Sequence, residues 1–370
     1  MRLLFDARYI RTDFHDGISR YSAELAAAVA TQAPERGVQV VFLIHDEAQL
    51  AFLPTGARTL RIHPPTAVRE PFTALLLNRH RPDAVFSPMQ TIGSVGRRFG
   101  LILTLHDTIY YRHRTPPRDL PWYVRLGWRL FHLSYVPQRL TLDAADVVAT
   151  VSETSAAEFA RVRLTKRPVV VVPNAPQRLA ELLPDGVAEG ASVTPGTRNL
   201  VYMGSFMPYK NVETLIRAVG ELPGRTLHLL SRISPHRRAE LEALIRPSGG
   251  DVVFHGGVTD AEYARLLARE AVLVSASLDE GYGLPVAEAL ALGVPAVVTD
   301  MPIFREVAGA GALYAPGEDA AAFAAGIRAL DDPARRAEVI AAGTAHIARF
   351  DWGRSASVLL DAVATLPTRG

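Results

Sequence analysis

Two glutamates, Glu280 and Glu288, follow a short apolar run at residues 271–274 and are separated by seven residues. The run predicts a strand, and Pro285 predicts the start of a helix because its fixed φ suits the first helical position. Glu280 would then lie in the loop and Glu288 about one turn into the helix. Unpaired amides at a helix N-terminus favour an anion, so carboxylates beside them are better suited to accept hydrogen bonds from the hydroxyls of a sugar and a ribose. The same residues also fit a solvated loop acid and a glutamate that merely favours a helix N-terminus.

A loop of small residues with one lysine follows a second apolar run. This run, at residues 199–203, leads into Gly204, Ser205 and Lys210, and a helix with a regular apolar face comes next. Such a strand-to-helix junction is suited to hold a diphosphate, and Lys210 would neutralise the charge that develops on a leaving group. In the alternative interpretation, Asn211 caps the helix and Lys210 is solvated.

A histidine and a glycine occupy similar junctions nearer the N-terminus. His106 comes directly after the apolar run at residues 101–105, where it would face a ligand at the carboxyl end of a central strand. In the alternative, His106 is a structural residue held by Asp107. Gly17 lies before the first helix, where it either lets a substrate approach the backbone or simply forms a turn. The spacing around Gly17 is not the dinucleotide fingerprint G-x-G-x-x-G, so a nicotinamide site is disfavoured.

Composition excludes several classes of function. Forty Lys and Arg residues against 38 Asp and Glu residues leave a formal net charge of +2, which gives no general electrostatic case for nucleic acid. The chain contains no cysteine, so disulfides, thiolate catalysis and Cys-ligated zinc are excluded. No metal-ligand or P-loop spacing occurs, and we expect no metal. No stretch approaches the ~18 uninterrupted apolar residues of a spanning helix, so we expect a cytoplasmic protein, with peripheral contact to the inner face of the membrane left open.

Residues 110–139 interleave arginines with tyrosine, tryptophan and phenylalanine. A stretch of this kind is able to meet an anionic leaflet or a lipid-linked acceptor. It also fits an ordinary amphipathic helix whose aromatic side chains face the core.

The length of 370 residues suits two domains. Short apolar runs alternate with helix-period segments, which predicts βαβ units and parallel sheets covered on both faces. The expected fold class is α/β, with two doubly wound Rossmann-like domains that bind a ligand at the carboxyl ends of their strands. We expect a first domain at residues 1–175, a linker at 176–197, a second domain at 198–349, and a C-terminal helix at 350–370 that returns to the first domain. The expected strands are residues 3–5, 38–44, 60–62, 84–86, 101–105, 147–151 and 169–172, then 199–203, 227–230, 252–254, 271–274, 296–298 and 312–314.

The ordered motifs together resemble the retaining glycosyltransferases of family four, which have the GT-B fold and use nucleotide-sugar donors. The matching segments are spread over most of the chain: DGISRY, TLHD, ADVVATVSE, VVPN, VYMGSFMPYKNVETLIRA, FHGGVTD, and EGYGLPVAEALALGVPAVVTD with IFREVAG. The resemblance implies two Rossmann-like domains that face each other across a cleft, the first for the acceptor and the second for the nucleotide sugar.

The resemblance also implies roles for individual residues. Glu280 and Glu288 match the two glutamates of the family's E-x7-E motif, the first beside the donor sugar and the second beside the ribose. Lys210 matches the lysine that binds the diphosphate. His106 matches the histidine that faces the reacting sugar, and Gly17 matches the glycine near the phosphates and the acceptor.

Loop residues complete the implied donor site. Its members match loops that meet the base, the phosphates or the sugar, and they are Gly204, Ser205, Gly257, Val258, Tyr282, Gly283 and Leu284. Ser205 departs from the family, since several relatives have there an arginine that also grips the diphosphate. Lys210 would then bind the diphosphate either more alone or together with an arginine that the sequence does not identify.

The expected function is metal-independent transfer of a sugar from a nucleotide diphosphate sugar to a hydroxyl of a glycan or lipid-linked acceptor, with retained anomeric configuration and no separate cofactor. Mannose from GDP-mannose is favoured because the EGYGLP loop resembles that of mannosyltransferases, although enzymes that use UDP-sugars share it. The alternatives are a non-catalytic nucleotide-sugar-binding protein, and a nucleotide-sugar hydrolase or epimerase of the same fold.

Overall fold

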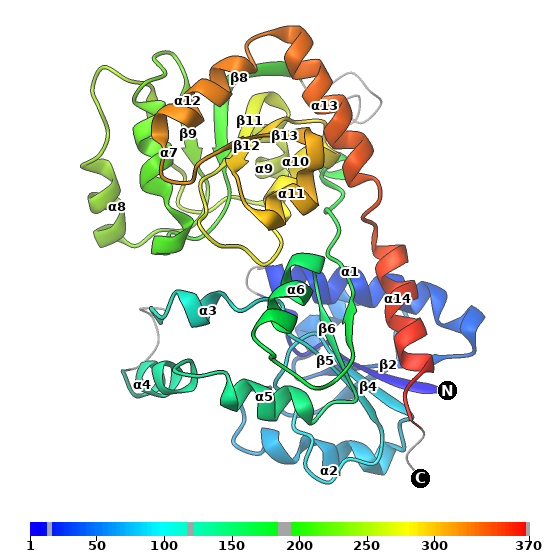
Figure 1. Cartoon of the computed structure of the whole chain (residues 1–370). Coiled ribbons are helices and arrows are strands. Elements are labelled where there is room, and N and C mark those ends of the chain that lie inside the picture. Colours follow the sequence, from blue (N-terminus) through cyan, green and yellow to red (C-terminus); the bar gives the residue numbers. More distant parts are fainter. Residues whose placement is uncertain (13–16, 117–121, 184–193, 368–370) are drawn as a thin grey trace. The chain divides into compact units, whose positions relative to one another are not determined.

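The computed structural model describes residues 1–12, 17–116, 122–183 and 194–367 (Figure 1). It divides into two compact units, one formed by Met1–Asn174 with Phe350–Gly370 and the other by Ala175–Arg349. Each unit has its own parallel sheet with helices packed against it. The expected fold class, α/β with two doubly wound Rossmann-like domains, is confirmed.

Within the described residues, the first unit contains a seven-stranded parallel sheet in the order β3-β2-β1-β4-β5-β6-β7. Its strands are β1 Arg2–Asp6, β2 Gln39–Ile44, β3 Thr59–Arg61, β4 Ala84–Ser87, β5 Gly100–Thr104, β6 Val147–Thr150 and β7 Val169–Val171. Leu4 of β1 pairs with Val41 on one side and Val85 on the other. The central strands are buried on both faces, which is why they appear in the sequence as unbroken apolar runs. The direction of winding reverses between β1 and β4.

The described part of the second unit repeats this plan with six parallel strands in the order β10-β9-β8-β11-β12-β13. The strands are β8 Thr194–Tyr202, β9 Thr226–Leu229, β10 Asp251–Phe254, β11 Arg269–Ser275, β12 Ala296–Thr299 and β13 Ala312–Ala315. Here the winding reverses between β8 and β11, where Leu200 pairs with Val272. In open parallel sheets, ligands bind at such a reversal, outside the carboxyl ends of the strands.

Helices cover the sheets. In the first unit they are α1 Gly17–Gln32, α2 Thr73–Leu77, α3 Ile109–Arg112, α4 Trp122–Phe131, α5 Val136–Asp143, α6 Glu153–Arg161 and α14 Trp352–Ala364. In the second they are α7 Val212–Val219, α8 Pro235–Glu242, α9 Asp260–Leu267, α10 Leu284–Ala291, α11 Pro302–Ala308, α12 Ala320–Ala329 and α13 Pro333–Ile347. Among the described residues, no helix is both long and apolar enough to cross a bilayer.

The C-terminal helix α14 packs along α1 in the first unit (Figure 1, red and blue). Gln32 joins them, because its Nε2 donates to the Gly353 carbonyl at 2.8 Å and its Oε1 accepts from Ser357 Oγ at 2.8 Å. Helix α1 has an apolar face, on which Tyr21 and Leu25 are fully buried.

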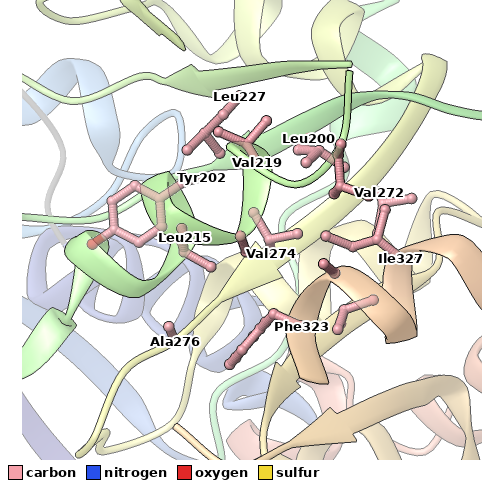
Figure 2. Packing of buried hydrophobic residues seen from close by; sticks show 14 of the residues in the cluster. Leu200, Tyr202, Leu215, Val219, Leu227, Val272, Val274, Ala276, Phe323 and Ile327 are labelled. Atoms are coloured by element: carbon pink, nitrogen blue, oxygen red, sulfur yellow. The ribbon is translucent and has the colours of Figure 1, made fainter. Parts of the chain in front are cut away.

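Figure 2 shows the core of the second unit. Its members come from the sheet and from α7 and α12, and they include Leu200, Tyr202, Leu215, Val219, Leu227, Val272, Val274, Ala276, Phe323 and Ile327. Each large apolar side chain buried here contributes about 1.5–3 kcal/mol to folding. Tyr202 also has a polar role, since its hydroxyl donates to the Ser205 carbonyl at 2.6 Å. The same residue therefore fills the core and holds the loop that follows β8.

Every strand expected from the sequence is present, and the bounds differ by at most two residues except for β8. That strand begins at Thr194, because Thr194 pairs with Arg269 and the regular register resumes at Asn199 opposite Ala271. A bulge that breaks the apolar pattern thus conceals the start of the strand. Within the predicted linker at residues 176–197, Leu179–Leu182 forms a short 3-10 helix, and β8 begins at Thr194. Residues 184–193 lie outside the described residues.

Helix α4 differs from the interpretation in which the aromatic side chains of residues 110–139 face the core. None of its residues is buried, and Trp122 and Tyr123 are 75% and 61% exposed. Tyr111 does pack inward, stacked on Tyr135 with ring centroids 4.2 Å apart. Arg118 of the predicted basic segment lies outside the described residues. The core-facing interpretation is therefore wrong for α4.

Candidate functional site

Residues from two separate sequence motifs meet where the second sheet reverses its winding. A small cavity of about 10 Å³, on the order of one water molecule, lies between the carboxyl ends of β8 and β11. Lys210, Glu280 and Gly283 line it, together with Tyr202 of β8 and Ser275 of β11. This position is the one at which an open parallel sheet is expected to bind a ligand.

Lys210 and Glu280 form an ion pair. The lysine Nζ lies 2.6 Å from Glu280 Oε1, and both side chains are only 14% exposed. Ser277 Oγ donates to the same carboxylate oxygen at 2.9 Å. Limited contact with water strengthens the attraction between the two charges and makes removal of either partner costly.

The choice of lysine at this position is notable in this sequence. The whole chain contains two lysines against 38 arginines. A lysine presents a compact point charge on a flexible stem, whereas an arginine presents a wide planar fork. The narrow space at Lys210 suits the first of these.

Hydrogen bonds join the loops that carry the two charges. Leu278 N donates to the Tyr209 carbonyl at 2.8 Å, and Asn211 Nδ2 donates to the carbonyls of Ala276 and Gly317 at 3.2 and 2.6 Å. Asn211 stands at the N-terminal boundary of α7, but its side chain caps no helix amide. The alternative in which Asn211 is a helix cap and Lys210 is solvated is therefore wrong.

Gly283 shapes the start of α10. Its φ of 90° lies in the left-handed region, and a Cβ there would lie 2.7 Å from Phe304 Cε1. Glycine is therefore required on both counts. Helix α10 begins at Leu284, one residue before the predicted Pro285, with no capping side chain and no acid in its first turn. Its first amides favour an anion at this end of the helix.

Glu288 and Tyr282 lie close in sequence to this cavity but outside its lining. Glu288 is about one turn into α10, as expected, and is completely buried. Tyr282 is 4% exposed, and burial raises the pKa of its phenol, which therefore stays protonated.

Tyr202 holds the loop that follows β8. A Cβ at Gly204 would lie 2.8 Å from the Tyr202 hydroxyl oxygen, so only glycine lets the loop close over the tyrosine. Burial raises the pKa of Tyr202, which keeps the hydroxyl as a donor to Ser205. Gly204 and Ser205 thus follow the strand as predicted, and Tyr202 orders them.

Gly257 and Val258 follow β10, two strands away from β8, or roughly 10 Å along the sheet. Gly257 has a φ of 117°, and its amide donates to the Leu230 carbonyl at 2.9 Å. They stand at the same edge of the sheet as Lys210 but do not line its cavity.

Two histidines of the second unit lie close together: His228 in β9 and His255 directly after β10. His228 Nδ1 is 3.0 Å from His255 Nε2, and His228 Nε2 is 3.1 Å from Asn199 Oδ1. Burial lowers the pKa of His228, and the neighbouring His255 lowers it further. Burial likewise lowers the pKa of His255, against a smaller opposite effect of Glu262.

His106 and Gly17 belong to the first unit. His106 follows β5 as expected, and its Nε2 lies 2.9 Å from the Pro88 carbonyl. A carbonyl only accepts, so Nε2 carries the hydrogen. The ring packs edge-on against Tyr21 with centroids 5.1 Å apart, and Ser155 Oγ donates to the His106 carbonyl at 2.9 Å. Gly17 is the first residue of α1, the helix that carries Tyr21, and Asp16 lies outside the described residues.

Sequence reasoning missed two side chains that organise the site. Ser277, which bonds Glu280, is three residues before it and gives only a weak signal. Tyr202 is the last residue of an apolar strand, so the sequence indicates only a core residue. Elsewhere, Ser152 caps α6, with its Oγ accepting from Ser155 N at 3.0 Å. Among the described residues, no three His, Asp or Glu side chains gather as a metal site would require.

Comparison with known proteins decides the family. Residues 16–175 match the family model of the glycosyl transferase 4-like domain, and residues 197–332 match that of glycosyl transferases group 1. The chain is a family-four-like glycosyltransferase with the GT-B fold.

Relatives and solved structures agree with this assignment. O-antigen chain mannosyltransferase B of Escherichia coli is 28% identical over 279 residues, which cover 72% of this glycosyltransferase and 70% of the relative. Sucrose-phosphate synthase from Thermosynechococcus elongatus aligns with a TM-score of 0.72 at 20% identity over 98% of both chains. HepE of Anabaena, solved with UDP and glucose, aligns with a TM-score of 0.70 at 17% identity, covering 99% of this chain and 100% of HepE.

The histidine pair predicts an acid-sensitive second unit. An unfolded histidine takes up a proton near the ordinary histidine pKa of 6.5, whereas the folded pair resists protonation because its pKa values are lowered. The stability is thus complete above about pH 6.5 and is lost as the pH falls through the folded pKa. We expect the free energy of unfolding of the second unit to decrease from pH 7 to 5, and to decrease less in His255→Gln, measured by urea titration.

The exposed His236 of α8 offers a matched control, since its side chain is 71% exposed. His236→Gln should keep the wild-type pH dependence. If the free energy of unfolding decreased equally with pH in the wild type and in His255→Gln, the assignment of the acid sensitivity to this pair would be contradicted.

Proposed function

We propose that this glycosyltransferase moves a sugar from a nucleotide diphosphate sugar to an acceptor hydroxyl, with retention of anomeric configuration and without a metal ion. The observation that carries the proposal is the contact between Lys210 and Glu280. A nucleotide diphosphate sugar presents anionic diphosphate oxygens next to the hydroxyl donors of its sugar. A lysine and a carboxylate held side by side complement these two neighbouring groups.

The chemistry follows from where charge develops. Lys210 and the first amides of α10 stabilise the diphosphate as it leaves, which is the main catalytic contribution in a loose transition state. Glu280 orients hydroxyls of the donor sugar. No carboxylate acts as a covalent nucleophile; the acceptor attacks on the face from which the diphosphate departs, and the leaving phosphate takes its proton.

The remaining assignments rest on the family resemblance. Glu288 binds the ribose, and Gly257 and Val258 bind the base. His106 faces the reacting sugar, and Gly17 lies near the phosphates and the acceptor. The donor is GDP-mannose, favoured by the name of the E. coli relative, a mannosyltransferase. A UDP-sugar is the alternative, supported by the complex of HepE with UDP and glucose. The acceptor is a glycan or a lipid-linked glycan.

Removal of either charge is expected to abolish most transfer. The donor is first chosen as the nucleotide sugar that raises the melting temperature most, since a bound ligand stabilises the folded state. With that donor and a pool of oligosaccharide acceptors, release of the nucleoside diphosphate should fall at least ~100-fold in Lys210→Ala and in Glu280→Ala, because each loses stabilisation of charge at the reacting group.

Two controls separate catalysis from folding. Lys166→Ala, at the only other lysine and exposed, should keep full activity. The double variant Lys210→Ala with Glu280→Ala leaves no uncompensated charge, so it should be more stable than either single variant and equally inactive. Near wild-type turnover in either single variant would remove the site assignment.

Transfer is expected to continue without divalent metal. Lys210 and the α10 amides supply the positive charge that a metal ion provides in other transferases. The rate of nucleoside diphosphate release should be unchanged after dialysis against EDTA. A rate lost in EDTA and restored by Mn²⁺ or Mg²⁺ would contradict this mechanism.

The alternative functions have distinct signatures. A non-catalytic binding protein would be stabilised by the donor and would never consume it. A hydrolase or epimerase would consume the donor at the same rate without acceptor. Nuclear magnetic resonance of the product linkage tests the retained configuration.

Peripheral contact with the membrane is supported by α4 and the segment after it. Large apolar side chains are exposed there, namely Trp122, Tyr123, Val124, Leu126, Leu130, Leu133, Val136 and Leu140. Between residues 122 and 142 the sequence has three arginines and no acid. Exposed aromatic and aliphatic groups with only basic neighbours suit the surface of an anionic bilayer. The protein would then lie at the cytoplasmic face of the membrane, where a lipid-linked acceptor is available.

This contact is expected to depend on both lipid charge and apolar side chains. The protein should sediment with vesicles that contain phosphatidylglycerol and not with pure phosphatidylcholine, and 0.5 M salt should weaken binding by screening. The variant Trp122→Ser with Leu126→Ser should bind at least tenfold more weakly, while Leu50→Ser, an exposed leucine elsewhere in the first unit, should not change it. Equal sedimentation of all three proteins would rule the contact out.

A further inference from the structure

A second cavity, far larger than the one at Lys210, opens in the first unit. Its volume is about 590 Å³, within the usual range for ligand pockets of roughly 300–1,000 Å³. It lies at the carboxyl ends of β2 and β3, where His45, Arg61 and His63 line it from the sheet. Arg69 and Phe72 line it from the other side. The pocket thus combines two guanidinium groups with an apolar wall.

The walls of this pocket are held by a buried ion cluster. Arg8, whose side chain has no exposed surface, binds both oxygens of Asp6 at 2.8 and 2.9 Å and both oxygens of Glu70 at 2.8 Å. Its Nη1 also donates to the His63 carbonyl at 3.1 Å. Arg8 therefore ties the end of β1 to the two segments that carry the pocket's arginines, so the pocket is largely formed before any ligand arrives.

His63 and Thr73 add hydrogen bonds to this cluster. His63 Nδ1 lies 3.2 Å from Glu70 Oε2, and His63 Nε2 lies 3.2 Å from Thr73 Oγ1. The Thr73 hydroxyl donates to the Glu70 carbonyl at 2.7 Å, so its oxygen accepts from the imidazole. His63 and Thr73 therefore help to hold Glu70, next to Arg69, against the sheet.

The mouth of the pocket keeps an excess of positive charge. Arg61 pairs with Glu47 at 3.0 Å on the surface, where both side chains are more than half exposed and the pair is weak. Arg69 is exposed and makes no side-chain hydrogen bond or ion pair with the residues that the structure describes. Phe72, 57% exposed, lies at the same mouth. An oxyanion on an apolar or ring-shaped body matches these groups.

The position of the pocket relates it to His106. Both lie at the carboxyl edge of the same sheet, and from β2 to β5 there are three strand spacings, roughly 14 Å. A long acceptor is able to reach both. We propose that this pocket binds a phosphate or carboxylate group of the acceptor, while the acceptor's hydroxyl lies toward His106. The acceptor role rests on the proposed transferase function; the binding of the oxyanion does not.

Titrations of the whole protein test the pocket directly by ligand-observed nuclear magnetic resonance. The anionic probes are glucose 6-phosphate and hexyl phosphate, which separate a sugar body from an alkyl body, and the neutral counterparts are glucose and hexanol. Inorganic phosphate tests the anion alone. We expect at least one anionic probe to bind at least tenfold more tightly than its neutral counterpart and than inorganic phosphate. Tighter binding of glucose 6-phosphate would indicate that the charged group belongs to a sugar. Tighter binding of hexyl phosphate would indicate that it belongs to a lipid.

Substitutions assign this binding to the two arginines. Arg61→Gln and Arg69→Gln should each weaken binding of the anionic probe at least tenfold, while Arg79→Gln, at an exposed arginine of the same unit outside the pocket, should leave it unchanged. Stabilisation of the variants by the nucleotide sugar reports that they are folded. Equal affinity for anionic and neutral probes, or binding unchanged in Arg69→Gln, would overturn the proposal.

These titrations contain no donor and no turnover. If the transferase function fails, the donor is not consumed but the probes still bind. If the pocket does not bind an oxyanion, the probes do not bind, while the donor still stabilises the protein and is consumed. The two failures are therefore distinguishable.

Discussion

The ion pair between Lys210 and Glu280 is the interaction on which the rest of the site depends. It joins the loop after β8 to the loop after β11, and these strands are neighbours because the second sheet reverses its winding there. The hydrogen bonds of Asn211 and the left-handed turn at Gly283 keep the two loops at this separation. A cation, a carboxylate and the start of a helix are thus held at one point, ready for a ligand with charged and hydroxyl groups side by side.

The first unit has the same kind of sheet topology but different residues at the carboxyl ends of its strands. Its winding reverses between β1 and β4, and the buried Arg8 cluster lies at the end of β1. His106, after β5, is fixed in orientation by the Pro88 carbonyl and by the ring of Tyr21. One unit therefore concentrates charge in a narrow site, while the other has a histidine and a wide pocket along a single sheet edge. This difference suits the phosphate-bearing donor and the larger acceptor that we propose.

The sheets were predictable because a parallel strand covered on both faces must be apolar throughout, and such runs stand out in the sequence. The start of β8 was not predictable, because the bulge opposite Glu270 places Pro195 and Gly196 inside the strand. The exposure of α4 was not predictable either. Its aromatic and apolar residues have the composition of a core-facing helix, and only the structure shows that none of them is buried.

By itself, the sequence determined which chemical groups stand at the ends of strands: a lysine after β8, a glutamate after β11, a histidine after β5, each recognisable because an apolar run ends there. Only the tertiary structure decided that Lys210 and Glu280 touch, that Glu288 is buried, and that Tyr202 holds the loop beside them. Lys210 and Glu280 are 70 residues apart. Their contact depends on which strands become neighbours, and strand order is set by the packing of the whole sheet and its helices, not by any local pattern of residues.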